Sequence, residues 1–119
     1  MDRIYHLSTC STCKKILAGL FPKGIPDAFR VSDVKTHPIS PEELDEVAGI
    51  AGSYQGLLNK QSRKYKAMDL KDTVMSEQQI RTLILSDYTL LKRPLVVYNG
   101  NVYAGNAPST VDALARSLA

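Results

Sequence analysis

The two cysteines of this chain, Cys10 and Cys13, form one Cys-x-x-Cys motif, a spacing that is typical of thiol redox chemistry. Residues 3–7 alternate in the manner of a short, half-buried strand, and residues 13–20 place apolar side chains on one helical face. Cys10 therefore falls at the start of a helix, where unpaired backbone N–H groups stabilise a thiolate. The pattern predicts that Cys10 is a redox nucleophile and that Cys13 attacks the mixed disulfide that it forms.

Each cysteine also has a structural interpretation, because free cysteine is among the most frequently buried residue types. This alternative is stronger for Cys13, since its side chain belongs to the apolar face of the expected helix. A zinc site is not expected, because the motif lacks a second pair of ligands and both histidines are isolated. The chain has no glycine-rich phosphate loop either, so no metal or nucleotide cofactor is expected.

Composition is that of an ordinary globular protein: 119 residues, 44% apolar and 23% charged. No apolar run approaches the ~20 residues that cross a bilayer, and the first residues lack a signal-peptide pattern. We therefore expect a cytoplasmic protein without membrane contact. The net charge of +3 and the basic run 60–66 suit anionic substrates or weak nucleic-acid binding, and equally a solvated basic face.

The elements that must position the cysteines follow from turn and capping signals. The first are a second strand at 28–31 and a helix from Ser40 to about Ile50 that Gly52 helps to end. A basic, otherwise irregular segment with a helical turn near 56–58 follows, and then a helix opened by the capping box 76–79. The last are a hairpin around Asn99-Gly100 and a terminal helix after Pro108. The order βαβ, helices, then ββα is that of an α/β protein with a thioredoxin-like fold. We expect a single domain over residues 1–119, with a helical insertion at approximately 36–90.

The motif Cys-Ser-Thr-Cys-Lys-Lys at 10–15, the insertion, and the run Leu-Lys-Arg-Pro-Leu-Val-Val at 91–97 together resemble the arsenate reductase/Spx family. The resemblance covers essentially the whole chain. It implies a glutaredoxin-like protein in which Cys10 is the nucleophile and Arg93 faces it, ready to pair with an oxyanion. It also implies that Pro94 is cis and lies opposite the active-site cysteine. Glutathione or a thioredoxin-type protein would then supply the reducing equivalents.

Three further residues are candidates for binding a substrate. The backbone N–H of Thr12 is placed to contribute to an anion-binding nest at the helix start. Glutaredoxin-type arsenate reductases use two more arginines, which the resemblance maps near Asn59 and near 105–106, and neither position is basic here. Lys60 or Arg63 could substitute for these arginines in space, although an offset lysine does not reproduce a planar, bidentate guanidinium. These departures argue against full arsenate reductase activity.

Two functions remain open. The first is a cytosolic thiol-disulfide oxidoreductase that acts on a small thiol or oxyanion substrate, with a redox protein as a partner. The alternative is an Spx-like redox-sensing transcription regulator that binds RNA polymerase, which the dithiol and the missing arginines favour. Against it, Spx-type proteins usually carry an arginine near the position of Gln61. Direct binding of nucleic acid is expected in neither case.

Overall fold

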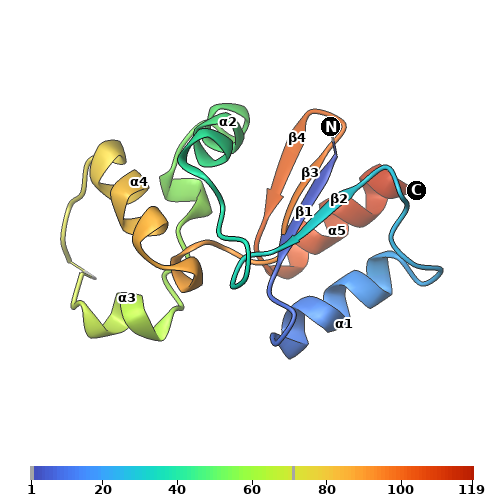
Figure 1. The fold of residues 1–119 in the computed structure, drawn as a ribbon, viewed down its shortest axis with the longest axis horizontal. Coiled ribbons are helices and arrows are strands. Elements are labelled where there is room, and N and C mark those ends of the chain that lie inside the picture. Colours follow the sequence, from blue (N-terminus) through green and yellow to red (C-terminus); the bar gives the residue numbers. More distant parts are fainter. Residues whose placement is uncertain (1, 71) are drawn as a thin grey trace.

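A four-stranded sheet forms the centre of the computed structural model, which describes residues 2–70 and 72–119 (Figure 1). The strands are β1 (Arg3–His6), β2 (Arg30–Asp33), β3 (Leu95–Tyr98) and β4 (Asn101–Ala104). Their order in the sheet is β2-β1-β3-β4, with β2 parallel to β1 and the other two pairs antiparallel. This topology confirms the thioredoxin-like fold expected from the sequence.

Helical segments connect and cover the strands. They are α1 (Ser11–Leu20), α2 (Pro41–Ala51), α3 (Arg63–Ala67), α4 (Glu77–Ser86), α5 (Pro108–Leu118) and two 3-10 turns, η1 (Gln55–Leu57) and η2 (Tyr88–Leu90). The segments from α2 to η2 lie between β2 and β3 in sequence and form the expected helical insertion. Figure 1 shows α3 and α4 at the end of the molecule away from α1 and α5. No helix within 2–70 or 72–119 combines the length and apolar character needed to cross a bilayer.

Successive side chains of each strand point to opposite faces of the sheet, so the core has two layers. Ile4 of β1 packs in one layer with Leu17 of α1 and Leu114 of α5. The next residue, Tyr5, points to the opposite face, where it packs with Leu44 of α2 and other residues of the insertion. The sheet therefore separates the helix that carries the cysteines from the helices of the insertion.

The capping and turn signals act as expected. Ser40 caps α2 by accepting a hydrogen bond from a backbone N–H in the first turn, and Gly52 ends the helix with φ 95°. Ser76 opens α4 with a complete capping box. Asn99 and Gly100 both have positive φ, which a tight hairpin turn between β3 and β4 requires.

The second strand begins two residues later than expected. It runs from Arg30 to Asp33 rather than over 28–31. The cause is Phe29, whose N–H donates to the carbonyl of Pro26 in a turn at 3.0 Å. The ring of Phe29 then packs in the layer beneath α1 instead of extending the strand.

The basic segment between α2 and α4 is more ordered than expected. The turn near 56–58 is present as η1, and the segment also contains α3, where an irregular segment was expected. Ser62 caps α3 by accepting a hydrogen bond from the N–H of Lys64 at 3.1 Å. Tyr65 anchors the helix, since its side chain is buried in the layer of the insertion.

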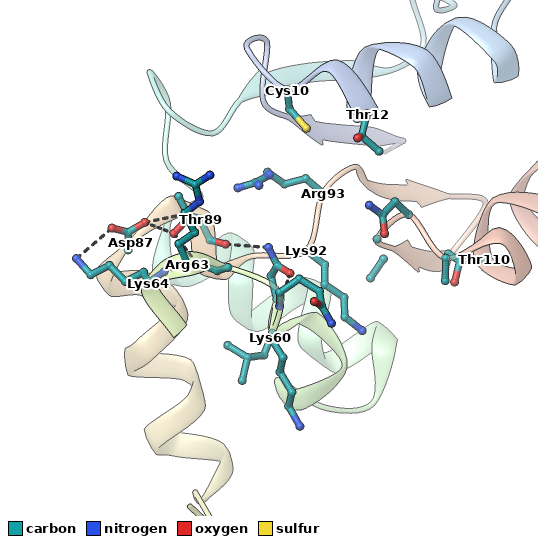
Figure 2. Close-up of a pocket in the computed structure, with 18 of the residues that line it drawn as sticks. Cys10, Thr12, Lys60, Arg63, Lys64, Asp87, Thr89, Lys92, Arg93 and Thr110 are labelled. Atoms are coloured by element: carbon teal, nitrogen blue, oxygen red, sulfur yellow. Dashed lines mark hydrogen bonds and ion pairs between the residues drawn. The ribbon is translucent and has the colours of Figure 1, made fainter. Parts of the chain in front are cut away.

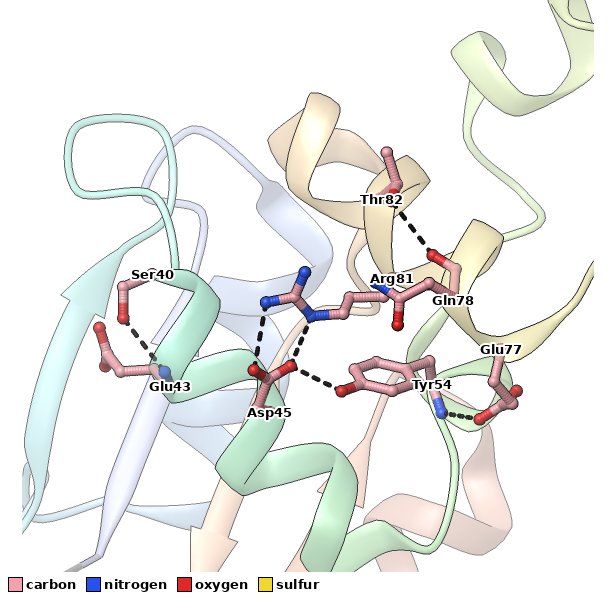
Figure 3. A network of polar contacts seen from close by, with 8 residues as sticks. All are labelled: Ser40, Glu43, Asp45, Tyr54, Glu77, Gln78, Arg81 and Thr82. Carbon is pink, nitrogen blue, oxygen red and sulfur yellow. Dashed lines mark hydrogen bonds and ion pairs between the residues drawn. The ribbon is translucent and has the colours of Figure 1, made fainter.

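A polar network joins the insertion's elements (Figure 3). Arg81 of α4 donates two hydrogen bonds to Asp45 of α2, at 2.6 and 3.1 Å, and the Tyr54 hydroxyl donates to the same carboxylate at 2.6 Å. The Tyr54 N–H donates to Glu77 at 2.6 Å. These groups lie near the surface, so each pair stabilises the fold only slightly. The network joins α2 and α4 to Tyr54, the residue that precedes η1.

Candidate functional site

A cleft of about 980 Å³ opens beside Cys10, between the start of α1, the insertion and the start of α5 (Figure 2). Five residues expected from the sequence to act in the site line it: Cys10, Thr12, Lys60, Arg63 and Arg93. Other residues that line it are Asn59, Gln61, Ser62, Lys64, Asp87, Thr89, Lys92, Gly105, Asn106 and Thr110. Segments that are far apart in the sequence thus line one cleft beside the Cys10 thiol.

Cys10 occupies the N-cap position of α1, and no side chain caps the helix. Burial opposes ionisation of its half-buried thiol. The backbone N–H of Cys13, the Cys13 thiol, the positive charge of Arg93 and the N–H of Thr12 outweigh this cost, and together they lower the pKa of Cys10 below its ordinary value of 9.0. Cys10 therefore has the properties of an activated thiol.

Cys13 lies one helical turn further on and has no exposed surface. Burial, followed by its contacts with Cys10, raises the pKa of the Cys13 thiol to about 11. Both cysteines are free thiols in this structure. Within 2–70 and 72–119, no three His, Cys, Asp or Glu side chains gather where they would hold a metal ion. The pair thus combines a partly exposed thiol of lowered pKa with a buried thiol of raised pKa.

Arg93 extends into the cleft opposite Cys10 (Figure 2). Its Nη1 donates to the carbonyl oxygen of Tyr88 at 3.5 Å, while its buried Nε has no hydrogen-bond partner among the described residues. The Arg93–Pro94 peptide bond is cis, as the fold resemblance implied. Pro94 itself is buried and is not one of the described residues that line the cleft.

Lys60 and Arg63 both line the cleft, but they differ in direction. In Figure 2 the guanidinium of Arg63 points towards that of Arg93, whereas the side chain of Lys60 extends away from Cys10. The geometry therefore brings a second arginine to the site from α3, although it is not at the position that the family resemblance indicates.

Asn59 shows what replaces that family arginine. Its side-chain N–H donates to the carbonyl of Thr89 at 3.1 Å, and its side-chain oxygen accepts from the N–H of Gln61 at 3.1 Å. Both polar ends of the amide are thus engaged with the backbone. Asn59 holds the turn that leads to α3 and does not present a charge to the cleft.

Three polar residues of the cleft wall, Ser62, Asp87 and Thr89, were not predicted from the sequence. Their only local signals are those of helix caps and turns, and these are satisfied in the structure: Ser62 caps α3 and Asp87 caps η2. Nothing in the sequence shows that Thr89 joins the two caps, because its hydrogen bond to Ser62 links residues that are 27 positions apart. Predicting these residues would have required knowing that the insertion folds so that the start of α3 lies beside η2.

Comparisons with known proteins agree with this geometry. The model of the ArsC family matches residues 5–114. The chain belongs to the ArsC family. An arsenate reductase of Haemophilus influenzae is 26% identical over 110 residues, which cover 91% of this chain and 93% of that protein. The global transcriptional regulator Spx of Streptococcus mutans is 22% identical over 106 residues, covering 88% of this chain and 76% of that one.

A solved structure of an arsenate reductase from Vibrio cholerae aligns with a TM-score of 0.75 and 27% identity, over 94% of this chain and 95% of that one. The family recognised from the sequence is thereby confirmed. Membership supports the general class of thiol oxidoreductase-like proteins. The relatives include both reductases and a regulator.

Proposed function

We propose that this protein is a thiol-disulfide oxidoreductase in which Cys10 is the nucleophile and Cys13 the resolving thiol. One observation carries the proposal: a partly exposed thiol with a lowered pKa, Cys10, is followed one helical turn later by a buried thiol, Cys13, whose pKa is raised to about 11. Thiolates attack disulfides, and protonated thiols do not. The first attack is therefore assigned to Cys10, and Cys13 stays protonated until a mixed disulfide has formed.

The reaction has two exchange steps. The Cys10 thiolate attacks one sulfur of a substrate disulfide, a Cys10–substrate disulfide forms, and the other substrate sulfur leaves as a thiolate. Cys13 then loses its proton and attacks Cys10, which releases the second substrate thiolate and leaves a Cys10–Cys13 disulfide. Two molecules of a thiol such as glutathione, or one dithiol protein, reduce this disulfide and are themselves oxidised.

The basic wall of the cleft supports an anionic substrate. Arg93 and Arg63 present guanidinium groups to the space beside Cys10, and planar guanidinium groups bind carboxylates and oxyanions through paired hydrogen bonds. Thr12 adds a backbone N–H at the start of α1. In this assignment Pro94 shapes the wall from behind, and Lys60 contributes positive charge at the outer rim.

Turnover of 2-hydroxyethyl disulfide with glutathione as the reductant tests the proposal. The wild-type protein should consume glutathione faster than the uncatalysed exchange. Cys10→Ser should abolish this acceleration, and a matched change on the same helix, Ser11→Ala, should preserve it. Full activity in Cys10→Ser would contradict the proposal, provided that circular dichroism shows both variants to be folded.

A second candidate function is redox-dependent regulation through RNA polymerase. The observation that favours it is the dithiol itself, together with the similarity to Spx over 88% of this chain. It predicts that the protein binds purified RNA polymerase in one oxidation state only and without turnover. Absence of binding in both the oxidised and the reduced state would reject this candidate.

A further inference from the structure

Arg63 reaches the cleft from a helix that is too short to be stable alone. Helix α3 has five residues, and isolated helices of that length do not persist in water. Its position must come from contacts with the rest of the protein. Besides the buried ring of Tyr65, these contacts come from Ser62, which is only 6% exposed although it is polar.

Ser62 belongs to a chain of hydrogen bonds that ends at Asp87. The Thr89 hydroxyl donates to Asp87 at 2.6 Å, so its proton is already engaged. The Ser62 hydroxyl, 3.1 Å from the Thr89 oxygen, must therefore be the donor in that pair. Lys64 completes the set with an ion pair to Asp87 at 3.2 Å. We call Ser62, Lys64, Asp87 and Thr89 the clasp.

The clasp stays charged at neutral pH. Hydrogen bonds from the side chain and the backbone N–H of Thr89, opposed by slight burial and aided by Lys64, lower the pKa of Asp87 below its ordinary value of 3.8. The carboxylate is therefore ionised at pH 7. Thr89 is the link between the two halves of the clasp, because its hydroxyl is bonded both to Asp87 and to Ser62.

The same turn also supports Arg93. Thr89 lies in η2, and the carbonyl of its neighbour Tyr88 accepts the hydrogen bond from Arg93. The side chain of Asn59 is bonded to the carbonyl of Thr89. One short turn thus holds the helix that carries Arg63 and contacts the guanidinium of Arg93 (Figure 2).

We infer that Thr89 is a positioning residue that sets the selectivity of the site for anionic substrates, by holding Arg63 against the cleft opposite Arg93. This inference rests on the proposed function, since it concerns the substrate of the Cys10 thiolate. The substrate class that it names is a molecule with a carboxylate or oxyanion group close to the atom that Cys10 attacks. Positive charge held beside the thiolate increases the rate at which it reacts with such molecules, relative to neutral molecules of the same size.

Two alkylating reagents of similar size measure this selectivity. Iodoacetate carries a carboxylate next to the carbon that a thiolate attacks, and iodoacetamide is its neutral counterpart. The ratio of the two rates at Cys10, with the modified residue identified by mass spectrometry, reports the charge held at the site. The ratio should fall as salt is added, because salt screens exposed charges.

Thr89→Val removes the hydroxyl at nearly constant shape, and Thr89→Ser keeps it. We expect the iodoacetate-to-iodoacetamide ratio to fall by about threefold in Thr89→Val and to stay within about twofold of wild type in Thr89→Ser. Thr82→Val, an exposed threonine on α4 whose hydroxyl bonds within its own helix, is the matched control and should leave the ratio unchanged. Ser62→Ala is a second test of the same link, adds no volume, and should lower the ratio in the same way.

An unchanged ratio in folded Thr89→Val, or an equal fall in Thr89→Ser, would overturn the role of Thr89. The rate with iodoacetamide separates this result from a failure of the proposed function. A fast iodoacetamide reaction with an unchanged ratio rejects only the positioning role. A wild-type Cys10 that reacts no faster than an ordinary thiol rejects the oxidoreductase itself.

Discussion

Single-cysteine variants should separate one reactive thiol from one inert thiol. Cys13→Ser leaves Cys10 alone and retains a hydroxyl that can donate to its sulfur in place of the thiol. Cys10→Ser leaves Cys13 alone, still buried, and burial is the largest cause of its raised pKa. We expect Cys10 to react much faster with a small neutral disulfide at pH 7.

The size of the difference follows from ionisation, nucleophilicity and access. A thiol of pKa 9.0 is about one part in a hundred thiolate at pH 7, and Cys10 lies below that value. Cys13, at about 11, is about one part in ten thousand. The more basic thiolate is intrinsically more nucleophilic, by about tenfold over two pKa units. The net advantage of Cys10 is therefore at least about tenfold, and the complete burial of Cys13 adds to it.

The assay is the rate of release of thiopyridone from 4,4′-dithiodipyridine by each variant, under conditions where both remain folded. Cys13→Ser should react at least about tenfold faster than Cys10→Ser. Equal rates, or a faster reaction at Cys13, would refute the argument that burial and the helix start divide the roles of the two thiols. A denatured sample provides the control, since both cysteines should then react alike.

Three further changes test the site and the fold. Arg93→Gln should move the midpoint of the pH–rate profile of Cys10 to higher pH, because the arginine charge lowers the Cys10 pKa; an unmoved midpoint would contradict this. Leu44→Ala, at a side chain with no exposed surface, should lower the free energy of unfolding by about 2–5 kcal/mol in urea titrations, and a loss below about 1 kcal/mol would show that the layer repacks. Ser76→Ala removes the capping box of α4 and should cost about 1 kcal/mol in the same titration, whereas Thr82→Val on that helix should cost less.

Local signals were sufficient to predict most of the fold. Helix starts at Ser40 and Ser76 and the hairpin at Asn99-Gly100 depend on contacts within a few residues, which the sequence states directly. The predicted start of β2 was wrong because Phe29 is a residue type that favours strands. In the structure it follows a turn, and its side chain packs in the core. Tertiary packing decided that boundary.

The candidate site was predictable where its residues flank regular elements. Cys10 begins α1 and Arg93 precedes β3, so the fold alone brings them together. Helix α3 of the insertion was not predictable in this way, because it is held by contacts with residues that are distant in the sequence, such as the hydrogen bond between Ser62 and Thr89. The sequence therefore left Lys60 and Arg63 as equal candidates, and only the structure shows that Arg63 points towards Arg93 (Figure 2). The extent of the single domain, 1–119, stays a prediction.

The most direct test of the two-thiol mechanism is the mass of the protein after brief exposure to oxidised glutathione. Cys13→Ser should accumulate a glutathione adduct at Cys10, because no second thiol is present to release it. The wild-type protein should instead lose two hydrogen atoms and carry a Cys10–Cys13 disulfide without an adduct. A stable adduct on the wild-type protein, or an adduct at Cys13 in Cys10→Ser, would contradict the account.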